Sequence, residues 1–399
     1  MASRGNCRRV LIIVENLPSP FDRRVWQEAT TLHKNGYQVA IICPKGKGYE
    51  DSYQHLDGVH IYRHWLPPEA NGAFGYLLEY SAALTFEFFL ALKIAFKHGF
   101  DVIHACNPPD NIFIVAGFFR LFGKRFLFDH HDITPELYEA KFGRKDFFYK
   151  MMLMWERLTF RLADVSIATN ESYREIAISR GKMPPEKVFV VRSGPDLTRL
   201  QILPPAARYK CGRKYLVGYV GVMGAQEGLD HLLRIVRTIV FDRGRDDIHF
   251  CLVGGGTELA KLKNYAQELD VSDHVTFTGR VDDQTLLEVL NTAEVCVNPD
   301  VPSEMNNKST MNKIMEYMSL AKPIVQYDLD EGRRSALDAS LYAEHNNEED
   351  FANKILQLLD DSALRDRMGR FGRNRVQDEL EWKHEIPKLL AAYDTLFSR

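Results

Sequence analysis

The chain has 399 residues and a formal net charge of −3, and this length predicts two domains. Apolar residues make up 45% and charged residues 26% of the sequence, which excludes a disordered or fibrous protein. The near-neutral charge argues against a nucleic-acid-binding protein, because such domains are strongly basic. Up to Asp196 the chain holds 25 Lys and Arg against 22 Asp and Glu, and the remainder carries a net charge of −6. We therefore expect the two halves to have different partners.

The six cysteines are scattered and form no CxxC pair. Cys43 and Cys296 lie inside apolar runs, where a reduced cysteine acts as a small core residue. This pattern predicts no disulfide framework, no structural metal site and a location in the reducing cytoplasm. The apolar run 10–14 ends at Glu15 and is too short for a signal peptide. No stretch reaches the ~20 uncharged apolar residues that a membrane span needs.

Short β-branched runs alternate with amphipathic stretches in the first half of the sequence, which favours a parallel, doubly wound sheet. The expected strands are 10–14, 38–43, 59–64, 102–104, 126–128, 165–168 and 188–191. The expected helices are 24–35, 77–98, 111–122, 147–162 and 172–180.

The alternation restarts after a linker that contains Pro204 and Pro205. Strands are expected at 215–220, 249–253, 275–278, 295–298 and 324–326, and helices at 229–240, 258–269, 284–291, 311–319 and 348–360. The predicted fold class is α/β with two tandem Rossmann-like domains facing across a cleft. The predicted boundaries are 1–197 for the first domain, 198–212 for the linker, 213–380 for the second domain and 381–399 for a final helix that crosses back to the first.

Ligands of open parallel sheets bind outside the carboxyl ends of the strands, so the loops that follow strands are the candidates for function. Two such loops are rich in glycine, 220–228 with Gly221, Gly224 and Gln226, and 252–258 with Gly254 and Gly255. Glycine lets a phosphate or ribose approach backbone N–H groups. Neither loop has the GxGxxG spacing of a dehydrogenase, and a plain tight turn explains 252–258 equally well.

The stretch 306–318 combines polar and basic residues before a helix. Ser309 or Thr310 is expected to cap that helix, and Lys308 adds a full positive charge near the positive end of its dipole. A pyrophosphate fits there, and Glu316 lies two turns further on, where it can accept hydrogen bonds from a ribose. The alternative is a capped amphipathic helix without a ligand.

In the first half, the sequence Asp-His-His-Asp (129–132) follows an expected strand. Histidine changes its charge near neutral pH, so His131 and Asp132 suit acid–base work, sugar binding or a metal. Adjacent side chains diverge at a strand end, which argues against the metal. Arg24, in the first loop of the domain, is a candidate for reaching a phosphate across the cleft, and a solvated helix start is the alternative. The DxD sequence 328–330 is predicted to be a turn.

Two stretches, 118–128 and 141–150, mix aromatic residues with Arg and Lys. This mixture is compatible with docking on an anionic membrane surface, which would put the protein at the inner face of the cytoplasmic membrane. The same mixture is also common on surfaces without a membrane role, and both interpretations stay open.

Taken in order, the loops resemble the family 4 retaining glycosyltransferases of the GT-B class, over nearly the whole chain and most closely the branch that builds bacterial surface polysaccharides. The resemblance rests on the stretches 101–104, 131–132, 169–173, 192–196, 220–228, 252–256, 277–281 and 307–325 and on Trp382. It implies transfer of a sugar from a nucleotide-sugar donor, UDP- or GDP-linked, to a glycan, lipid-linked or small-molecule hydroxyl acceptor. It also implies no metal, no cofactor and no nucleic acid.

The resemblance assigns roles to the candidate residues. His131 belongs to the donor sugar, Lys308 with Ser309 and Thr310 to the phosphates, Glu316 to the ribose, and the backbone at 279–281 to the base. The candidate catalytic residues are His131, Asp132, Lys308 and Arg24. The candidate donor-binding residues are Gly221, Gly224, Gln226, Gly254, Gly255, Arg280, Val281, Ser309, Thr310 and Glu316.

The chain departs from the family at two places. The family has two glutamates eight residues apart, and here the first is Lys308. Val222 and Glu227 stand near the positions of the family's basic pair. One interpretation is that Lys308 has taken over phosphate neutralisation. The rivals are an epimerase or hydrolase of the same fold that acts on nucleotide sugars, and a catalytically inactive glycan-binding protein or complex subunit.

Overall fold

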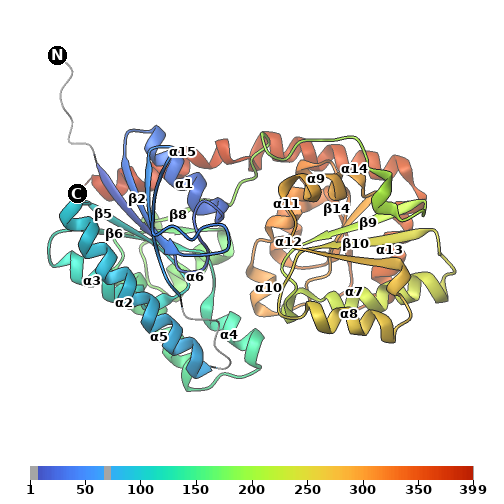
Figure 1. Ribbon diagram of the computed structural model, residues 1–399, viewed down its shortest axis with the longest axis horizontal. Helices are drawn as coiled ribbons and strands as arrows, with labels where there is room; N and C mark the ends of the chain where they lie inside the picture. Colours follow the sequence, from blue (N-terminus) through green and yellow to red (C-terminus); the bar gives the residue numbers. More distant parts are fainter. Residues whose placement is uncertain (1–7, 67–72, 399) are drawn as a thin grey trace, which may run out of the picture. The chain divides into compact units, whose positions relative to one another are not determined.

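The computed structural model describes residues 8–66 and 73–398, with side chains described for 8–66 and 81–398. The chain divides into two compact units, Met1–Ser193 with Glu385–Arg399, and Gly194–His384. Each unit is a sheet covered by helices (Figure 1). The last helix, α15 (Trp382–Phe397), starts in the second unit and has most of its residues in the first.

The first unit contains a sheet in the order β3-β4-β2-β1-β5-β6-β7-β8. All neighbouring strands are parallel except the antiparallel pair β3 and β4. The strands are β1 (Arg9–Ile13), β2 (Gln38–Pro44), β3 (Tyr53–Leu56), β4 (Val59–His64), β5 (Val102–Cys106), β6 (Arg125–His130), β7 (Val165–Ala168) and β8 (Val188–Val190). Strands β1, β5 and β6 are buried along nearly their whole length, as expected for a sheet covered on both faces. Strand β1 is apolar after Arg9, whereas β5 and β6 also bury His104, Asp129 and His130.

Three helices of the first unit, α1, α5 and α6, are capped by residue types that prefer this position. The Asp22 side chain accepts a hydrogen bond from the Val25 N–H at the start of α1. Asp146 and Asn170 accept hydrogen bonds from backbone N–H groups in the first turns of α5 and α6 in the same way. The helices are α1 (Arg23–Lys34), α2 (Ala73–Lys97), α3 (Phe113–Arg120), α4 (Thr134–Phe142), α5 (Phe147–Leu162) and α6 (Glu171–Ser179), joined by α15.

The second unit contains a fully parallel sheet in the order β11-β10-β9-β12-β13-β14. Its strands are β9 (Tyr215–Val220), β10 (Ile248–Val253), β11 (Val275–Gly279), β12 (Val295–Asn298), β13 (Ile324–Tyr327) and β14 (Ser340–Ala343). Its helices are α7 (Leu229–Arg237), α8 (Leu259–Glu268), α9 (Asp283–Thr292), α10 (Glu304–Lys308), α11 (Asn312–Ser319), α12 (Asp330–Ala336), α13 (Glu348–Asp360) and α14 (Ser362–Arg375).

The structure confirms the predicted α/β class with two parallel-sheet units. It adds two strands that the sequence analysis did not predict, β3 and β14. Strand β3 is short and polar, so its propensity is weak. The hairpin that follows it did carry a signal, because Asp57 and Gly58 both have positive φ (48° and 80°) in the turn to β4, and Asp-Gly is a preferred pair there.

The predicted helix 229–240 is shorter than expected. Helix α7 ends at Arg237 and continues as a π-helical turn over Thr238–Asp242. The predicted DxD turn holds as far as Leu329, and α12 begins at Asp330. The five described cysteines are free thiols, and Cys7 lies outside the described residues. Among the described residues no helix has both the length and the apolar character needed to span a membrane.

Candidate functional site

A buried arginine organises the carboxyl ends of the strands in the first unit. The Arg24 guanidinium, on the first turn of α1, lies 2.8 Å from Asp129 Oδ1 and 3.1 Å from Glu28 Oε1. Its Nη1 also donates to the backbone oxygen of Val191 at 2.8 Å. All three side chains are nearly inaccessible to solvent. The structure therefore gives Arg24 a positioning role within this unit, where its donors are already engaged.

The two carboxyl groups around Arg24 differ in how readily they ionise. Burial acts to raise the pKa of Asp129, but Arg24 and His131 outweigh it and hold this pKa well below its ordinary range. Burial and the neighbouring Asp129 raise the pKa of Glu28 well above its ordinary value. The Arg24 charge therefore favours ionisation of Asp129, whereas burial and Asp129 disfavour ionisation of Glu28.

His131 is the member of this cluster that reaches the surface. Its Nε2 lies 2.6 Å from Asp129 Oδ2, and 15% of its side chain is exposed. Arg24 Nε lies 2.9 Å from the same ring nitrogen and 3.3 Å from Asp129 Oδ2. The Arg24 Nε–H is thus shared between the ring nitrogen and the carboxylate. Arg24 and Asp129 together hold the His131 ring in place.

The loop that carries His131 is held by Asn107, which follows β5. Asn107 Oδ1 accepts hydrogen bonds from the backbone N–H groups of His131 at 2.7 Å and Asp132 at 3.2 Å. Its Nδ2 donates to the Asp132 carbonyl at 2.6 Å. Burial raises the pKa of the Asp132 carboxyl. The predicted pair His131 and Asp132 therefore lies in a loop at the end of β6 that Asn107 holds in place. Of the two side chains, the structure shows a contact with Asp129 for His131.

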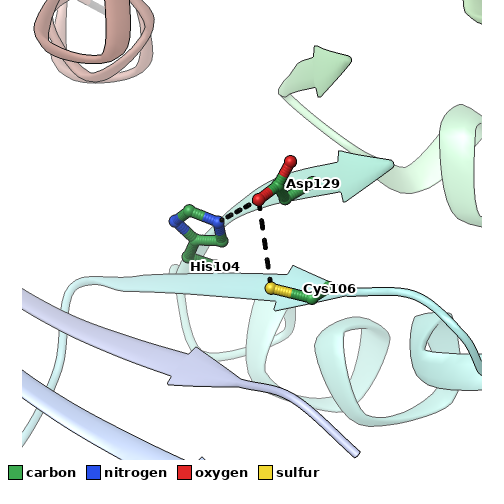
Figure 2. Close-up of side chains that lie close together, drawn as sticks. All are labelled: His104, Cys106 and Asp129. Carbon is green, nitrogen blue, oxygen red and sulfur yellow. Dashed lines mark hydrogen bonds and ion pairs between the residues drawn. The ribbon is translucent and has the colours of Figure 1, made fainter. Parts of the chain in front are cut away.

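Asp129 also lies beside two side chains of β5, as Figure 2 shows. His104 Nε2 is 3.3 Å and Cys106 Sγ is 4.0 Å from Asp129 Oδ2, and His104 Nδ1 is 2.8 Å from the Tyr393 hydroxyl of α15. The ligand atoms of these three residues lie within 4.8 Å of one another, as do those of Glu28, Asp129 and His131.

These two groups fit a metal ion poorly. Burial raises the pKa of Cys106 well above its ordinary value, and a protonated thiol is a weak ligand. The Arg24 guanidinium already neutralises Asp129, so a cation would have to displace it. The arrangement is that of a hydrogen-bonded cluster, and metal independence stays a prediction.

The second unit also gathers a basic side chain and two acids at its strand ends. Lys313, on the first turn of α11, lies 2.7 Å from Glu227 Oε2 and 2.9 Å from Asp300 Oδ1. Burial acts to lower the pKa of Lys313, but the two acids raise it well above its ordinary value. Burial raises the pKa of Asp300 to about 7, while Lys313 holds that of Glu227 below its ordinary value. This Lys313 cluster ties α11 to the loop after β9.

The glycine-rich loops pack directly on each other. The Gly221 N–H donates to Val253 O and the Met223 N–H to Gly255 O, both at 3.0 Å. A Cβ at Gly254 would lie 1.8 Å from the Gly221 oxygen, and one at Gly256 would lie 2.4 Å from the Met223 oxygen. Close packing of backbone on backbone explains these two glycines. Gly255 has no such clash, since its nearest neighbour is Arg280 Cγ at 3.7 Å.

The predicted helix cap at Ser309 or Thr310 is wrong. Helix α11 begins at Asn312 with Met311 in the N-cap position and no side-chain cap. Ser303 caps the preceding short helix, α10, and Ser309 Oγ turns back to the carbonyl oxygen of Met305 at 2.7 Å. Lys308 is the last residue of α10 and not at a helix N-terminus, with its Nζ 2.7 Å from Glu304 Oε2. The residue near the start of α11 with a buried positive charge is Lys313.

The remaining candidates of the second unit are near its strand ends. Glu316 Oε1 accepts a hydrogen bond from Arg199 Nη2 at 2.8 Å. The backbone oxygen of Gln226 accepts one from Asn306 Nδ2 at 2.9 Å. Gly224 begins the 3₁₀ turn that contains Gln226. Arg280 and Val281 follow β11.

Comparison with known proteins covers both units. Residues 22–199 match the family model described as Glycosyltransferase Family 4, and residues 214–361 match the one described as Glycosyl transferases group 1. The chain is 25% identical over 186 residues to a 2-deoxystreptamine glucosyltransferase of Streptomyces kanamyceticus, a match covering 46% of each protein. It is 23% identical to an MMP alpha-(1->4)-mannosyltransferase of Mycolicibacterium hassiacum, over 79% of this chain and 75% of that one. Several such matches, the first among them, span less than half of the relative's length.

Solved structures match over nearly the whole chain. The sucrose-phosphate synthase of Thermosynechococcus elongatus superposes with a TM-score of 0.81 at 19% identity, over 98% of this chain and 99% of that one. WaaG, a glycosyltransferase involved in lipopolysaccharide biosynthesis, gives 0.72 at 15% identity over 98% and 100%. Anabaena HepE, solved in complex with UDP and glucose, gives 0.73 at 14% identity over 97% and 100%. At these identities the likeness concerns the fold.

Proposed function

Since the chain belongs to the GT-B glycosyltransferases, with a family 4 domain followed by a group 1 domain, we propose that it moves a sugar from a nucleotide-sugar donor to a hydroxyl acceptor with retention of configuration. The observation that carries this proposal is the geometry of His131. Its ring contacts Asp129 at the carboxyl end of a parallel strand, and 15% of the side chain is exposed. Such sheets bind their ligands at these strand ends. HepE, which shares the fold, is described in complex with UDP-glucose.

The described residues support a division of labour within this proposal. His131 contacts the donor sugar, and Arg24, Asp129 and Asn107 hold it in place. Glu316 and the backbone at Arg280 and Val281 bind the nucleoside. The role of Lys308, Ser309 and Thr310 at the phosphates rests on the resemblance alone, because Lys308 ends α10 and neither Ser309 nor Thr310 caps α11. Catalysis then consists of stabilising the leaving diphosphate with prearranged donors, and one of its oxygens takes the acceptor proton. The reaction needs neither metal nor protein nucleophile.

The proposed acceptor is a glycan, a lipid-linked intermediate or a small molecule with a hydroxyl group, and the proposed location is the cytoplasm. A place in polysaccharide or glycoconjugate biosynthesis is part of the same proposal. It follows from the resemblance to polysaccharide-building enzymes.

The first test is a thermal-shift screen with UDP-, GDP-, ADP- and dTDP-sugars, because a true donor raises Tm by mass action. The sugar donor found in this way is then incubated with the protein and candidate acceptors in excess chelator, and the anomeric configuration of the product is read by NMR. The proposal fails if no nucleotide sugar binds. An inverted product refutes retention, and donor turnover that ignores every acceptor favours the epimerase or hydrolase.

The second test replaces His131. We expect His131→Ala to lower kcat by about 10²–10³-fold with donor Kd changed less than about threefold, the pattern of a group that acts in the transition state. The control is His33→Ala, an exposed histidine of α1, which should leave both constants unchanged. Full activity of His131→Ala would remove this residue from the site.

A further inference from the structure

One face of the first unit exposes large apolar side chains to an unusual extent. We define the outer helix face as the exposed residues of α2 from Ser81, of α3 with the turn after it, and of α5. These helices neighbour one another on the same side of the sheet, α3 contacting both α2 and α5 (Figure 1). The large apolar residues of this face are Phe86, Phe89, Phe96, Ile114, Leu121, Phe122, Phe147, Met154 and Leu158.

On α2 the exposed apolar residues form a stripe. Phe86, Phe89 and Phe96 are three and seven residues apart, which places them on one side of a helix with 3.6 residues per turn. Lys93 lies in the same stripe, and Phe96 is 90% exposed. The Phe86 ring packs against His64 and Trp65, whereas Phe89 is 63% exposed.

The stripe of α2 continues onto α3 through a ladder of rings. Exposed Phe89 is 5.8 Å from Phe88, Phe88 is 5.0 Å from Phe118, and Phe118 is 5.2 Å from exposed Phe122, measured between ring centroids. The neighbouring Leu121 is 83% exposed. The two helices thus share one continuous aromatic surface.

Helix α5 repeats the pattern with interleaved positive charges. Phe147, Met154 and Leu158 are exposed at helical spacing, and exposed Lys150, Arg157 and Arg161 lie between or beside them. The acids within the described side chains of α2, α3 and α5 are Glu87 and Glu156, and both are buried. Among the side chains that the structure describes on these three helices, the exposed charges are therefore all positive.

We propose that the outer helix face is the docking surface for an anionic lipid bilayer. Exposed aromatic side chains enter the boundary between headgroups and acyl chains, and Lys and Arg at the rim attract anionic lipids. A second copy of this chain suits the face less well, because pairing two such faces would bring charges of the same sign together. This inference does not depend on the proposed reaction. It adds the membrane surface at which the protein would act.

The second unit supplies matched controls, because its exposed large apolar residues are separate. Ile202 and Phe241 are 58% and 52% exposed and lie in different parts of that unit, Ile202 before β9 and Phe241 in the π-helical turn after α7. Single exposed apolar residues of this kind are normal on soluble surfaces. Lys263 and Arg370 serve as exposed basic residues of the same unit.

The test is flotation of the full chain with vesicles of phosphatidylcholine, with and without about 30% phosphatidylglycerol. We expect binding to the anionic vesicles that weakens as salt rises. Phe89→Ser/Phe96→Ser and Lys150→Glu/Arg157→Glu should each lower the bound fraction about tenfold. Ile202→Ser/Phe241→Ser and Lys263→Glu/Arg370→Glu should bind like the parent, and circular dichroism checks that every variant is folded.

Three outcomes would overturn the proposal. The first is no binding of the parent to anionic vesicles at low salt. The second is equal loss of binding in the test variants and their controls, which would indicate general charge or apolar exposure. The third is a concentration-dependent dimer in sedimentation velocity that disappears in Phe89→Ser/Phe96→Ser while the vesicles stay unbound, which would make a second copy the occupant.

Discussion

Each unit buries a basic side chain between two acids, but the residues differ between the two units. In the first, Arg24 lies between Glu28 and Asp129, and in the second, Lys313 lies between Glu227 and Asp300. Both cations come from the first turn of a helix. Arg24 meets Glu28 of its own helix and Asp129 of β6, whereas Lys313 meets acids in the loops after β9 and β12. Arg24 has a planar fork that orients a carboxylate, which in turn orients His131. Lys313 is a point charge, and its acids belong to loops.

The two clusters differ in what their acids hold in place. The Arg24 cluster ends in a side chain that can exchange a proton and that reaches the surface. The Lys313 cluster instead supports the backbone of a loop. Glu227 belongs to the loop after β9, and this loop packs on the glycine-rich turn after β10. The proposed function therefore predicts that the first cluster positions a chemical group and that the second one shapes a binding loop.

Removing the Lys313 charge is expected to have the largest effect on stability. Lys313→Met leaves two buried carboxyl groups without their cation and should cost about 3–5 kcal/mol in the free energy of unfolding. The triple variant Lys313→Met/Glu227→Gln/Asp300→Asn should recover most of this loss. Urea unfolding measures both. Lys308→Met, which breaks a surface pair with Glu304, is the control and should change stability by less than about 0.5 kcal/mol. Equal changes in the free energy of unfolding for Lys313→Met and Lys308→Met would refute a stabilising role of the Lys313 cluster.

Glu87 offers a contrast to both clusters, since its buried carboxyl has no hydrogen-bond partner among the described residues. Burial raises its pKa from 4.5 to about 8. An acid whose folded pKa is raised is neutral below its unfolded pKa and costs stability as pH rises toward the folded one. Glu87→Gln should therefore match the parent near pH 4.5 and gain about 2–4 kcal/mol by pH 8. Unfolding at a series of pH values tests this, and a gain that does not change with pH would contradict it.

The smallest expected effect concerns Arg199, which holds Glu316 at 2.8 Å. If Glu316 accepts the ribose hydroxyls, Arg199→Gln loosens its carboxylate and should raise donor Kd about three- to tenfold, or roughly 1 kcal/mol. Calorimetry with the donor found by thermal shift measures this. Arg208→Gln, which breaks the pair with Glu288, is the matched control. An unchanged donor Kd in Arg199→Gln would argue against a contact between Glu316 and the ribose of the donor.

The alternation of apolar runs and amphipathic stretches predicted every strand of the two sheets except β3 and β14, because buried parallel strands are rich in apolar residues. The glycine-rich stretches 220–228 and 252–258 follow strands β9 and β10, as expected. The reason for these glycines was only partly visible, since the clash between Gly254 and the Gly221 oxygen arises from two loops that are distant in the sequence.

The charge clusters could not be predicted in the same way. Arg24 and Asp129 are 105 residues apart, and Lys313 and Glu227 are 86 apart. A single sequence shows the charges but not which of them meet. The misplaced cap at Ser309 has a local cause, because Ser303 provides an equally good cap six residues earlier and starts a separate short helix.

The most direct test of the account is the kinetic comparison of Asp129→Asn with Lys313→Met on the donor found by thermal shift. An asparagine keeps the shape but removes the carboxylate charge that holds the His131 ring, so Asp129→Asn should lower kcat by about 10²–10³-fold with donor Kd nearly unchanged. Lys313→Met should instead weaken donor binding, because the glycine-rich loop loses its support. The reverse pattern, with affinity lost in Asp129→Asn and turnover alone lost in Lys313→Met, would contradict the assignment of chemistry to the first unit and binding to the second.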